Sequence, residues 1–175
     1  MKILLFGKNG QVGWELHRAL QPLGEVIALG RKMADFSRPD SLRTVVRDIH
    51  PDVIVNAAAY TAVDDAEHNE ELATKINGTA PGVLAEEARK INALFVHYST
   101  DYVFDGLKTE PYLEADEPNP VNAYGRSKLI GERLVTESGC NHLILRTSWV
   151  YASRGHNFVK TILRLAADRN ELKVV

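Results

Sequence analysis

A tyrosine and a lysine four residues apart could carry out proton-transfer chemistry in the second half of the chain. Tyr124 and Lys128 lie at the start of a predicted helix over 123–137, and their spacing places them on one helix face. A neighbouring ammonium favours the phenolate and would lower the phenol pKa from its usual value of about 10. Tyr124 could then give a proton to a carbonyl oxygen as hydride reaches the carbon. The alternative is an ordinary surface helix start, since one such pair can arise by chance among six tyrosines.

Two hydroxyl side chains precede this helix. Ser99 and Thr100 follow an apolar run over 94–98 that predicts a buried strand, and either hydroxyl could hydrogen-bond the same carbonyl oxygen. The stretch over 105–123 contains several prolines and acidic residues and joins the two parts of the predicted catalytic site. Loops of this length inside a compact domain usually carry function.

Three glycines near the N-terminus have a spacing typical of a phosphate-binding turn. An apolar strand predicted over 2–6 leads into Gly7, Gly10 and Gly13, and helical spacing follows over 12–23. The first glycine permits the tight turn, the second lets the backbone approach a pyrophosphate, and the third lets helix and strand pack closely. The spacing is G-x-x-G-x-x-G rather than the G-x-G-x-x-G of most dinucleotide dehydrogenases. A glycine turn without a ligand is the alternative.

The residues after the second predicted strand (25–29) bear on the choice of cofactor. A carboxylate there would bond the 2′-hydroxyl of an NAD ribose, whereas an arginine accommodates the 2′-phosphate of NADP. Gly30-Arg31-Lys32 follows the strand and contains no carboxylate, so NADPH is favoured and NADH stays open. Asp35 could bind the adenine amino group, with Phe36 packed beside it. Alternatively, Arg31 and Lys32 are ordinary solvated loop residues that bind no phosphate.

The third predicted strand (52–58) ends in small residues, which leave room for a flat cofactor across the strand ends. The loop over 59–64 then lies at the carboxyl edge of the sheet, where open α/β sheets bind ligands. A long helix is predicted over 70–91, interrupted near Gly78, and its Asn77 could support Lys128 through water. Trp149, after a strand over 142–147, could cover a sugar ring or belong to the core.

The alternation of apolar strands with helical segments predicts an α/β fold, a Rossmann-like doubly wound parallel sheet flanked by helices. Further helices are predicted over 37–50 and 157–168, and a last strand over 172–175. We expect one NAD(P)-binding domain over 1–175. Because the chain stops on an incipient strand, we expect it to be a truncated domain.

Composition narrows the class of protein. The formal net charge of −2, without a basic cluster, gives no electrostatic case for nucleic acid. Cys140 is the single cysteine, which excludes an internal disulfide and fits a reducing compartment. The apolar N-terminal run is too short for a signal peptide or a membrane span. We therefore expect a cytoplasmic protein with no nucleic-acid or membrane partner.

The order of four motifs resembles the extended short-chain dehydrogenase/reductases, which act mainly on nucleotide sugars: the glycine turn, Asn56-Ala57-Ala58, Ser99-Thr100-Asp101 and Tyr124-x-x-x-Lys128. The sequences in and around these motifs are similar to those of the branch that reduces dTDP-linked 4-keto-6-deoxy sugars. This resemblance covers essentially the whole chain. That resemblance implies reduction of the C4 ketone of dTDP-6-deoxy-L-lyxo-4-hexulose by NADPH or NADH, giving dTDP-L-rhamnose. It also implies a much longer protein whose C-terminal part, largely absent here, builds the substrate lobe.

The motifs and the resemblance together assign roles to individual residues. The predicted catalytic residues are Thr100, Tyr124 and Lys128. The predicted cofactor contacts are Gly7, Asn9, Gly10, Gln11, Val12, Gly13, Arg31, Asp35, Phe36, Ala57, Ala58, Ala59, Tyr60, Asn77, Tyr124 and Lys128. The predicted substrate contacts are Thr61, Val63, Asp64, Thr100, Asp101, Tyr102, Phe104 and Trp149. No metal site is predicted, and a requirement for Mg²⁺ and a homodimer both stay open.

The motifs argue against only some of the other functions known in the same superfamily. The 4,6-dehydratases carry an Asp-Glu pair directly after the Ser/Thr, but here Asp101 is followed by Tyr102, so dehydration is disfavoured. A non-catalytic NADP-binding protein similar to the regulatory subunit of methionine adenosyltransferase stays open, as does another nucleotide-sugar epimerase or reductase.

Overall fold

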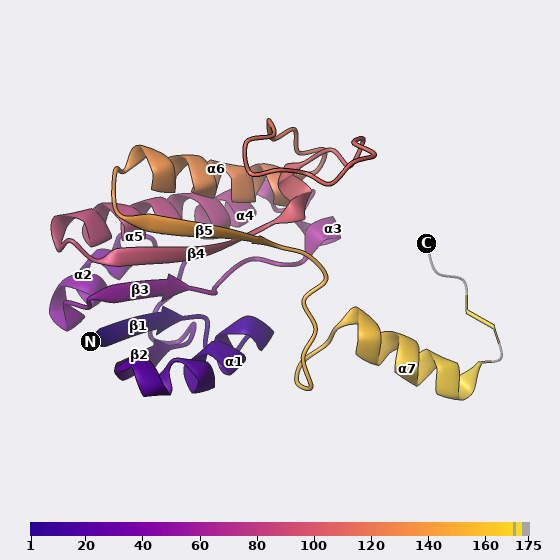
Figure 1. The fold of residues 1–175 in the computed structure, drawn as a ribbon, viewed down its shortest axis with the longest axis horizontal. Helices are drawn as coiled ribbons and strands as arrows, with labels where there is room; N and C mark the ends of the chain where they lie inside the picture. The colour runs from indigo at the N-terminus through magenta and orange to yellow at the C-terminus, as the bar shows by residue number, and fades with distance from the viewer. Residues whose placement is uncertain (170, 173–175) are drawn as a thin grey trace.

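The five strands form one parallel sheet in the computed structural model, which describes residues 1–169 and 171–172 (Figure 1). The strands are β1 (Lys2–Phe6), β2 (Glu25–Leu29), β3 (Val53–Asn56), β4 (Leu94–Thr100) and β5 (His142–Thr147). They lie in the order β2-β1-β3-β4-β5, and every neighbouring pair is parallel. This confirms the predicted doubly wound fold. Its topological switch point, where ligands bind in such sheets, lies between β1 and β3.

Helices cover both faces of the sheet (Figure 1). They are α1 (Gln11–Ala19), α2 (Ser41–Ile49), α3 (Val63–Ala66), α4 (Glu70–Thr74), α5 (Ala80–Lys90), α6 (Ala123–Glu137) and α7 (Phe158–Asp168). Side chains alternate along β1: Leu4 and Phe6 join the core under α2, α5 and α6, whereas Ile3 and Leu5 pack with α1. Both faces of the central strands are buried, which explains their unbroken apolar runs.

Two helices deviate from their predicted bounds for local reasons. The helix after the glycine turn ends at Ala19 rather than Leu23, and a 3-10 helix with an early proline covers Gln21–Leu23. The helix expected from Ser37 begins at Ser41. The Asp35 carboxylate accepts hydrogen bonds from the Ser37 backbone N–H (3.0 Å) and hydroxyl (2.8 Å), so Ser37 forms a turn instead of a helix cap.

The third strand and the long helix show how the chain is shaped near the site. The strand ends at Asn56 rather than Ala58, because the Asn56 side-chain oxygen accepts a hydrogen bond from the Ala58 N–H (3.0 Å) and turns the chain. The predicted interruption of the 70–91 helix is confirmed as a π-helical turn over Lys75–Thr79 between α4 and α5. Asn77 in this turn is buried.

Helix α7 stands apart from the sheet (Figure 1). Asn157 caps it by accepting a hydrogen bond from the Lys160 N–H, and the Trp149 and Phe158 rings meet edge to face at 4.9 Å. Of the strand expected over 172–175, residues 173–175 lie outside the described part. None of the helices in the described ranges is long and apolar enough to cross a membrane.

A buried carboxylate joins α2 to α5. Glu87 is 1% exposed and accepts hydrogen bonds from Arg43 (3.1 Å), Arg47 (2.7 and 2.9 Å) and Lys90 (2.7 Å). These bonds, that of Arg47 first, outweigh burial and lower the pKa of Glu87 from 4.5 to about 2. Because the folded-state pKa is depressed, the stability it contributes is complete above pH ~4.5 and is lost as pH falls toward ~2.

We therefore expect Glu87→Gln to lower the free energy of unfolding by about 1–3 kcal/mol at pH 7, since charge-assisted bonds to three cations weaken. Urea unfolding at pH 7 and pH 3 measures this, and the difference from wild type should shrink at the lower pH. Glu86→Gln is the matched control, because Glu86 is half exposed and meets only Arg43. An equal loss in both variants would contradict the special role of Glu87.

Candidate active site

The glycine turn after β1 is pinned by close backbone contacts. Gly7 has φ +84°, and a Cβ there would lie 2.6 Å from the Ala57 backbone. A Cβ on Gly13 would lie 2.1 Å from the Gly7 oxygen, whereas one on Gly10 would meet only that oxygen, at 3.4 Å. Gly10 precedes α1 without a side-chain cap, so the first N–H groups of α1 remain available to an anion. The turn has the shape of a phosphate cradle.

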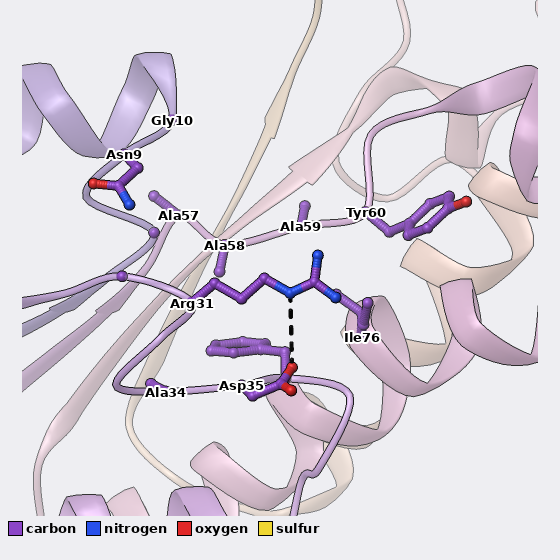
Figure 2. A pocket seen from close by; sticks show the side chains of 13 residues that line it. Asn9, Gly10, Arg31, Ala34, Asp35, Ala57, Ala58, Ala59, Tyr60 and Ile76 are labelled. Atoms are coloured by element: carbon purple, nitrogen blue, oxygen red, sulfur yellow. Dashed lines mark ion pairs between the residues drawn. The ribbon is translucent and has the colours of Figure 1, made fainter.

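A cavity of about 250 Å³ opens at the carboxyl ends of β1, β2 and β3, at the switch point (Figure 2). Ten of the predicted cofactor contacts line it: Gly7, Asn9, Gly10, Arg31, Asp35, Phe36, Ala57, Ala58, Ala59 and Tyr60. The cavity also includes Gly30, Ala34 and Ile76, which the motifs did not identify. The cavity therefore brings together predicted contacts from three loops separated by up to 50 residues.

Arg31 and Asp35 form one wall of this cavity. Figure 2 shows the Arg31 side chain extending between the Ala58–Ala59 segment and Asp35, and its Nε lies 4.0 Å from the Asp35 Oδ1. The hydrogen bonds from Ser37 lower the pKa of Asp35, which stays ionised at neutral pH. Because the Arg31 side chain is 80% exposed, its guanidinium is accessible to a ligand. Lys32 is exposed and does not line the cavity.

The three predicted catalytic residues lie where β4 ends and α6 begins. The Thr100 hydroxyl interacts with the half-buried Tyr124 phenol. Lys128 is buried, and its Nζ donates to the Tyr98 carbonyl at 2.6 Å. That carbonyl lies beyond the end of β3, whose last residue, Asn56, pairs with His97. Lys128 thus satisfies a backbone group that the sheet leaves free.

The electrostatics differ from the sequence expectation. Burial raises the pKa of Tyr124, and the Thr100 hydrogen bond offsets this only in part. The expected lowering of the Tyr124 pKa is therefore wrong for this structure: burial raises this pKa, and the Lys128 ammonium donates to the Tyr98 carbonyl instead. Burial lowers the pKa of Lys128 to about 8. At pH 7 the phenol keeps its proton and Lys128 is mostly cationic.

Two buried asparagines hold the loop that forms the far wall of the cavity. The Asn77 side chain accepts from the Tyr60 N–H (2.8 Å) and donates to the Tyr60 carbonyl and to the Ser127 hydroxyl (both 3.0 Å). Asn77 thus links Tyr60 to Ser127, the residue beside Lys128, and it does not line the cavity, contrary to its predicted role as a direct contact.

Asn56 is held in turn by a buried histidine. The Asn56 side-chain oxygen accepts from the Ala58 N–H, so the Asn56 amide nitrogen donates to His97 Nδ1 at 3.1 Å. The neutral His97 ring therefore carries its proton on Nε2. Burial first, and the charge of Lys128 second, hold the pKa of His97 well below its usual range. A second buried cation beside Lys128 is thereby avoided.

The remaining predicted contacts are spread along the same edge. Gln11 opens α1 with its side chain bonded to His156 and Asn157, and Val12 follows it in the same turn. Thr61, Asp64, Asp101 and Tyr102 are exposed, Val63 is half-buried, and Trp149 is 69% exposed, which excludes a core role for that indole. Phe104 differs from these: its ring is buried, stacked on Tyr112 at 4.1 Å and covered by Arg146 at 4.8 Å.

Across residues 1–169 and 171–172, no group of three or more His, Cys, Asp or Glu side chains could hold a metal ion. No motif identified Glu67, His97 or Gly30. Glu67 accepts a hydrogen bond from the Ala123 N–H, and His97 faces Asn56, so both act through neighbours distant in sequence. Gly30 lines the cavity, and its position directly after β2 was a local signal.

Comparisons with known proteins agree over the whole chain. The family model described as "RmlD substrate binding domain" matches residues 1–175. A curated dTDP-4-dehydrorhamnose reductase of Burkholderia thailandensis is 58% identical over 175 residues, which cover 100% of this chain and 59% of that protein.

Two solved structures are close in shape. A dTDP-4-dehydrorhamnose reductase of Clostridium acetobutylicum has a TM-score of 0.95 at 43% identity, covering 100% of this chain and 62% of that one. The reductase of Bacillus anthracis, solved in complex with NADP, has a TM-score of 0.93 at 39% identity, covering 98% and 61%. The chain therefore spans about 60% of the length of the relatives it matches.

Proposed function

Because residues 1–175 match its model from end to end, this chain belongs to the RmlD substrate binding domain family, and we propose that it serves NADPH-dependent reduction of a dTDP-sugar ketone. The reaction is reduction at C4 of dTDP-6-deoxy-L-lyxo-4-hexulose to dTDP-L-rhamnose, the activity for which its relatives are named. Residues 1–175 supply the nicotinamide-binding domain. Both nucleotide substrates are cytoplasmic metabolites, so the reaction would take place there.

The observation that carries this proposal is that Thr100, at the end of β4, interacts with the Tyr124 phenol at the start of α6, with the buried Lys128 one turn further along that helix. When bound, reduced nicotinamide supplies a hydride to the C4 carbon. Tyr124, which keeps its proton at neutral pH, gives that proton to the developing alkoxide. Thr100 hydrogen-bonds the same oxygen and orients the ketone. Lys128 adds a buried positive charge that stabilises the developing negative charge.

Features of the cavity support a dinucleotide as its ligand. Gly10 leaves its space open for a diphosphate over the uncapped start of α1, and the small Ala57–Ala59 wall leaves room for a flat ring system. Asp35, Phe36 and Arg31 line the cavity, which supports the proposal that the first two contact the adenine and that Arg31 binds a 2′-phosphate.

Cofactor choice gives a direct test. We expect Arg31→Ala to weaken NADPH binding by about 1.5–3 kcal/mol, the usual worth of a charge-assisted hydrogen bond, and to leave NADH binding nearly unchanged. Titration by nicotinamide fluorescence measures both affinities. Lys32→Ala is the matched control, because Lys32 is exposed and lies outside the cavity lining. Equal weakening of NADPH and NADH in Arg31→Ala would indicate a general loss of structure and contradict the assignment.

The function itself is tested by turnover. A protein of the full length of the relatives should oxidise NADPH when given dTDP-6-deoxy-L-lyxo-4-hexulose, with dTDP-L-rhamnose as product. Tight NADPH binding without any turnover would contradict the reductase and favour a regulatory NADP-binding role.

A further inference from the structure

Tyr124 lies in the first turn of α6, where backbone N–H groups lack helical partners. Asn122 satisfies one of them, since its side-chain oxygen accepts from the Gly125 N–H at 2.7 Å. A second is satisfied from far along the chain: Glu67 Oε1 accepts from the Ala123 N–H at 2.7 Å. A carboxylate at a helix N-terminus is also favoured by the helix dipole. The residue directly before Tyr124 is therefore held by a side chain 56 positions away.

Packing under the tyrosine comes from the same segment. Ala66, Ala73 and Ala123 form a fully buried cluster, and the Tyr124 and Tyr60 rings pack against it. Ala66 ends α3 and directly precedes Glu67, so the hydrogen bond and the apolar contact arise from adjacent residues. Small side chains let α3 and α4 approach the first turn of α6 closely. The position of the phenol thus depends on how the α3–α4 segment sits.

An ion pair nearby provides a natural comparison. Arg126 bonds Glu70 through two nitrogens, at 2.9 and 3.3 Å, and reaches Glu67 only at 3.8 Å. All three side chains are 40–49% exposed, and ion pairs of this kind contribute little. Glu70 lies on the same segment as Glu67 but touches no backbone group of α6. The bond between Glu67 and Ala123 is the specific link.

We propose that Glu67 is a positioning residue for Tyr124, an inference that depends on the reduction proposed above. Its carboxylate fixes the first turn of α6, so the phenol faces the ketone at the correct distance. Glu67 directly follows α3. The segment before it contains Thr61, Val63 and Asp64, which are candidate substrate contacts. Substrate bound to that segment would therefore act on the hydrogen bond between Glu67 and Ala123, which positions the proton donor Tyr124.

Three variants test the link in a protein of the relatives' full length. Glu67→Ala should lower kcat by roughly 10- to 100-fold, the cost of a small misplacement of a reacting group, with NADPH affinity unchanged. Glu67→Gln keeps an oxygen acceptor and should restore most of kcat. Glu70→Ala, the matched control, should resemble wild type. A purely stabilising role predicts instead a lower melting temperature for Glu67→Ala with normal kcat well below that temperature, and this result would overturn the inference.

A second measurement does not need turnover. In NMR spectra, Glu67→Ala should shift the Ala123 amide and the Tyr124 ring resonances, and Glu70→Ala should leave both in place. Unmoved Tyr124 resonances in Glu67→Ala would overturn the inference whatever the substrate. Absence of turnover in the wild-type protein, with shifted Tyr124 resonances, would contradict the proposed reduction and leave the structural link supported.

Discussion

Tyr124→Phe should reduce turnover by roughly 10²–10⁴-fold, the usual range for a lost general acid. The change keeps the ring and its edge-to-face contact with Tyr102 at 5.8 Å, so packing and NADPH affinity should remain nearly unchanged. It removes the proton that neutralises the C4 alkoxide. Single-turnover NADPH oxidation with the ketosugar, at the full length of the relatives, measures the effect. A fully active variant would refute the mechanism and reduce Tyr124 to a helix-start residue.

Two neighbouring variants serve as comparisons for that experiment. Thr100→Val removes one hydrogen bond at nearly constant volume and should lower turnover without changing cofactor binding. Lys128→Met removes a buried ammonium whose Nζ also holds the Tyr98 carbonyl. Its loss should reduce both rate and cofactor affinity, so an effect on NADPH binding distinguishes Lys128→Met from the other two variants.

Gly10→Val should weaken NADPH binding by roughly 100-fold or more, because each charge-assisted hydrogen bond to phosphate is worth about 1.5–3 kcal/mol and ~1.4 kcal/mol is tenfold in affinity. A Cβ there meets only the Gly7 oxygen, at 3.4 Å, so the fold should persist. It would occupy the space above the start of α1 where the diphosphate must lie. Isothermal titration measures the affinity, and circular dichroism checks the fold.

Gly13→Ala provides the contrast. Its Cβ would lie 2.1 Å from the Gly7 oxygen, so this smaller change should lower the melting temperature, which Gly10→Val should not do. Unchanged NADPH affinity in a folded Gly10→Val protein would disprove the phosphate cradle.

Much of the fold follows from local patterns. The apolar run at Lys2–Phe6 and the helix at Ala123–Glu137 match their predicted bounds, because strand hydrophobicity and helical spacing are properties of neighbouring residues. The spacing of its three glycines likewise predicted the glycine turn. Bounds failed where a side chain redirected the backbone, as Asn56 does at the end of β3. No periodicity signals such a bond.

The site was harder to predict where it depends on distant neighbours. The spacing of Tyr124 and Lys128 indicated their shared face but not how deeply α6 buries them, and burial decides the direction of both pKa shifts. Glu67 carried no motif, because its role is to accept one backbone hydrogen bond from a helix that begins 56 residues later. Such links become visible only once the sheet brings the loops together.

The pinning of the glycine turn has a consequence for the order of folding. Gly7 donates to the Leu29 carbonyl of β2, and Ala57 after β3 donates to the Phe6 carbonyl of β1. The turn therefore takes its shape only after three strands from separate parts of the chain have paired, and closing such long loops is slow. Contacts that form late slow unfolding far more than they speed folding. A bound dinucleotide would therefore prolong the lifetime of the native state without hastening its formation.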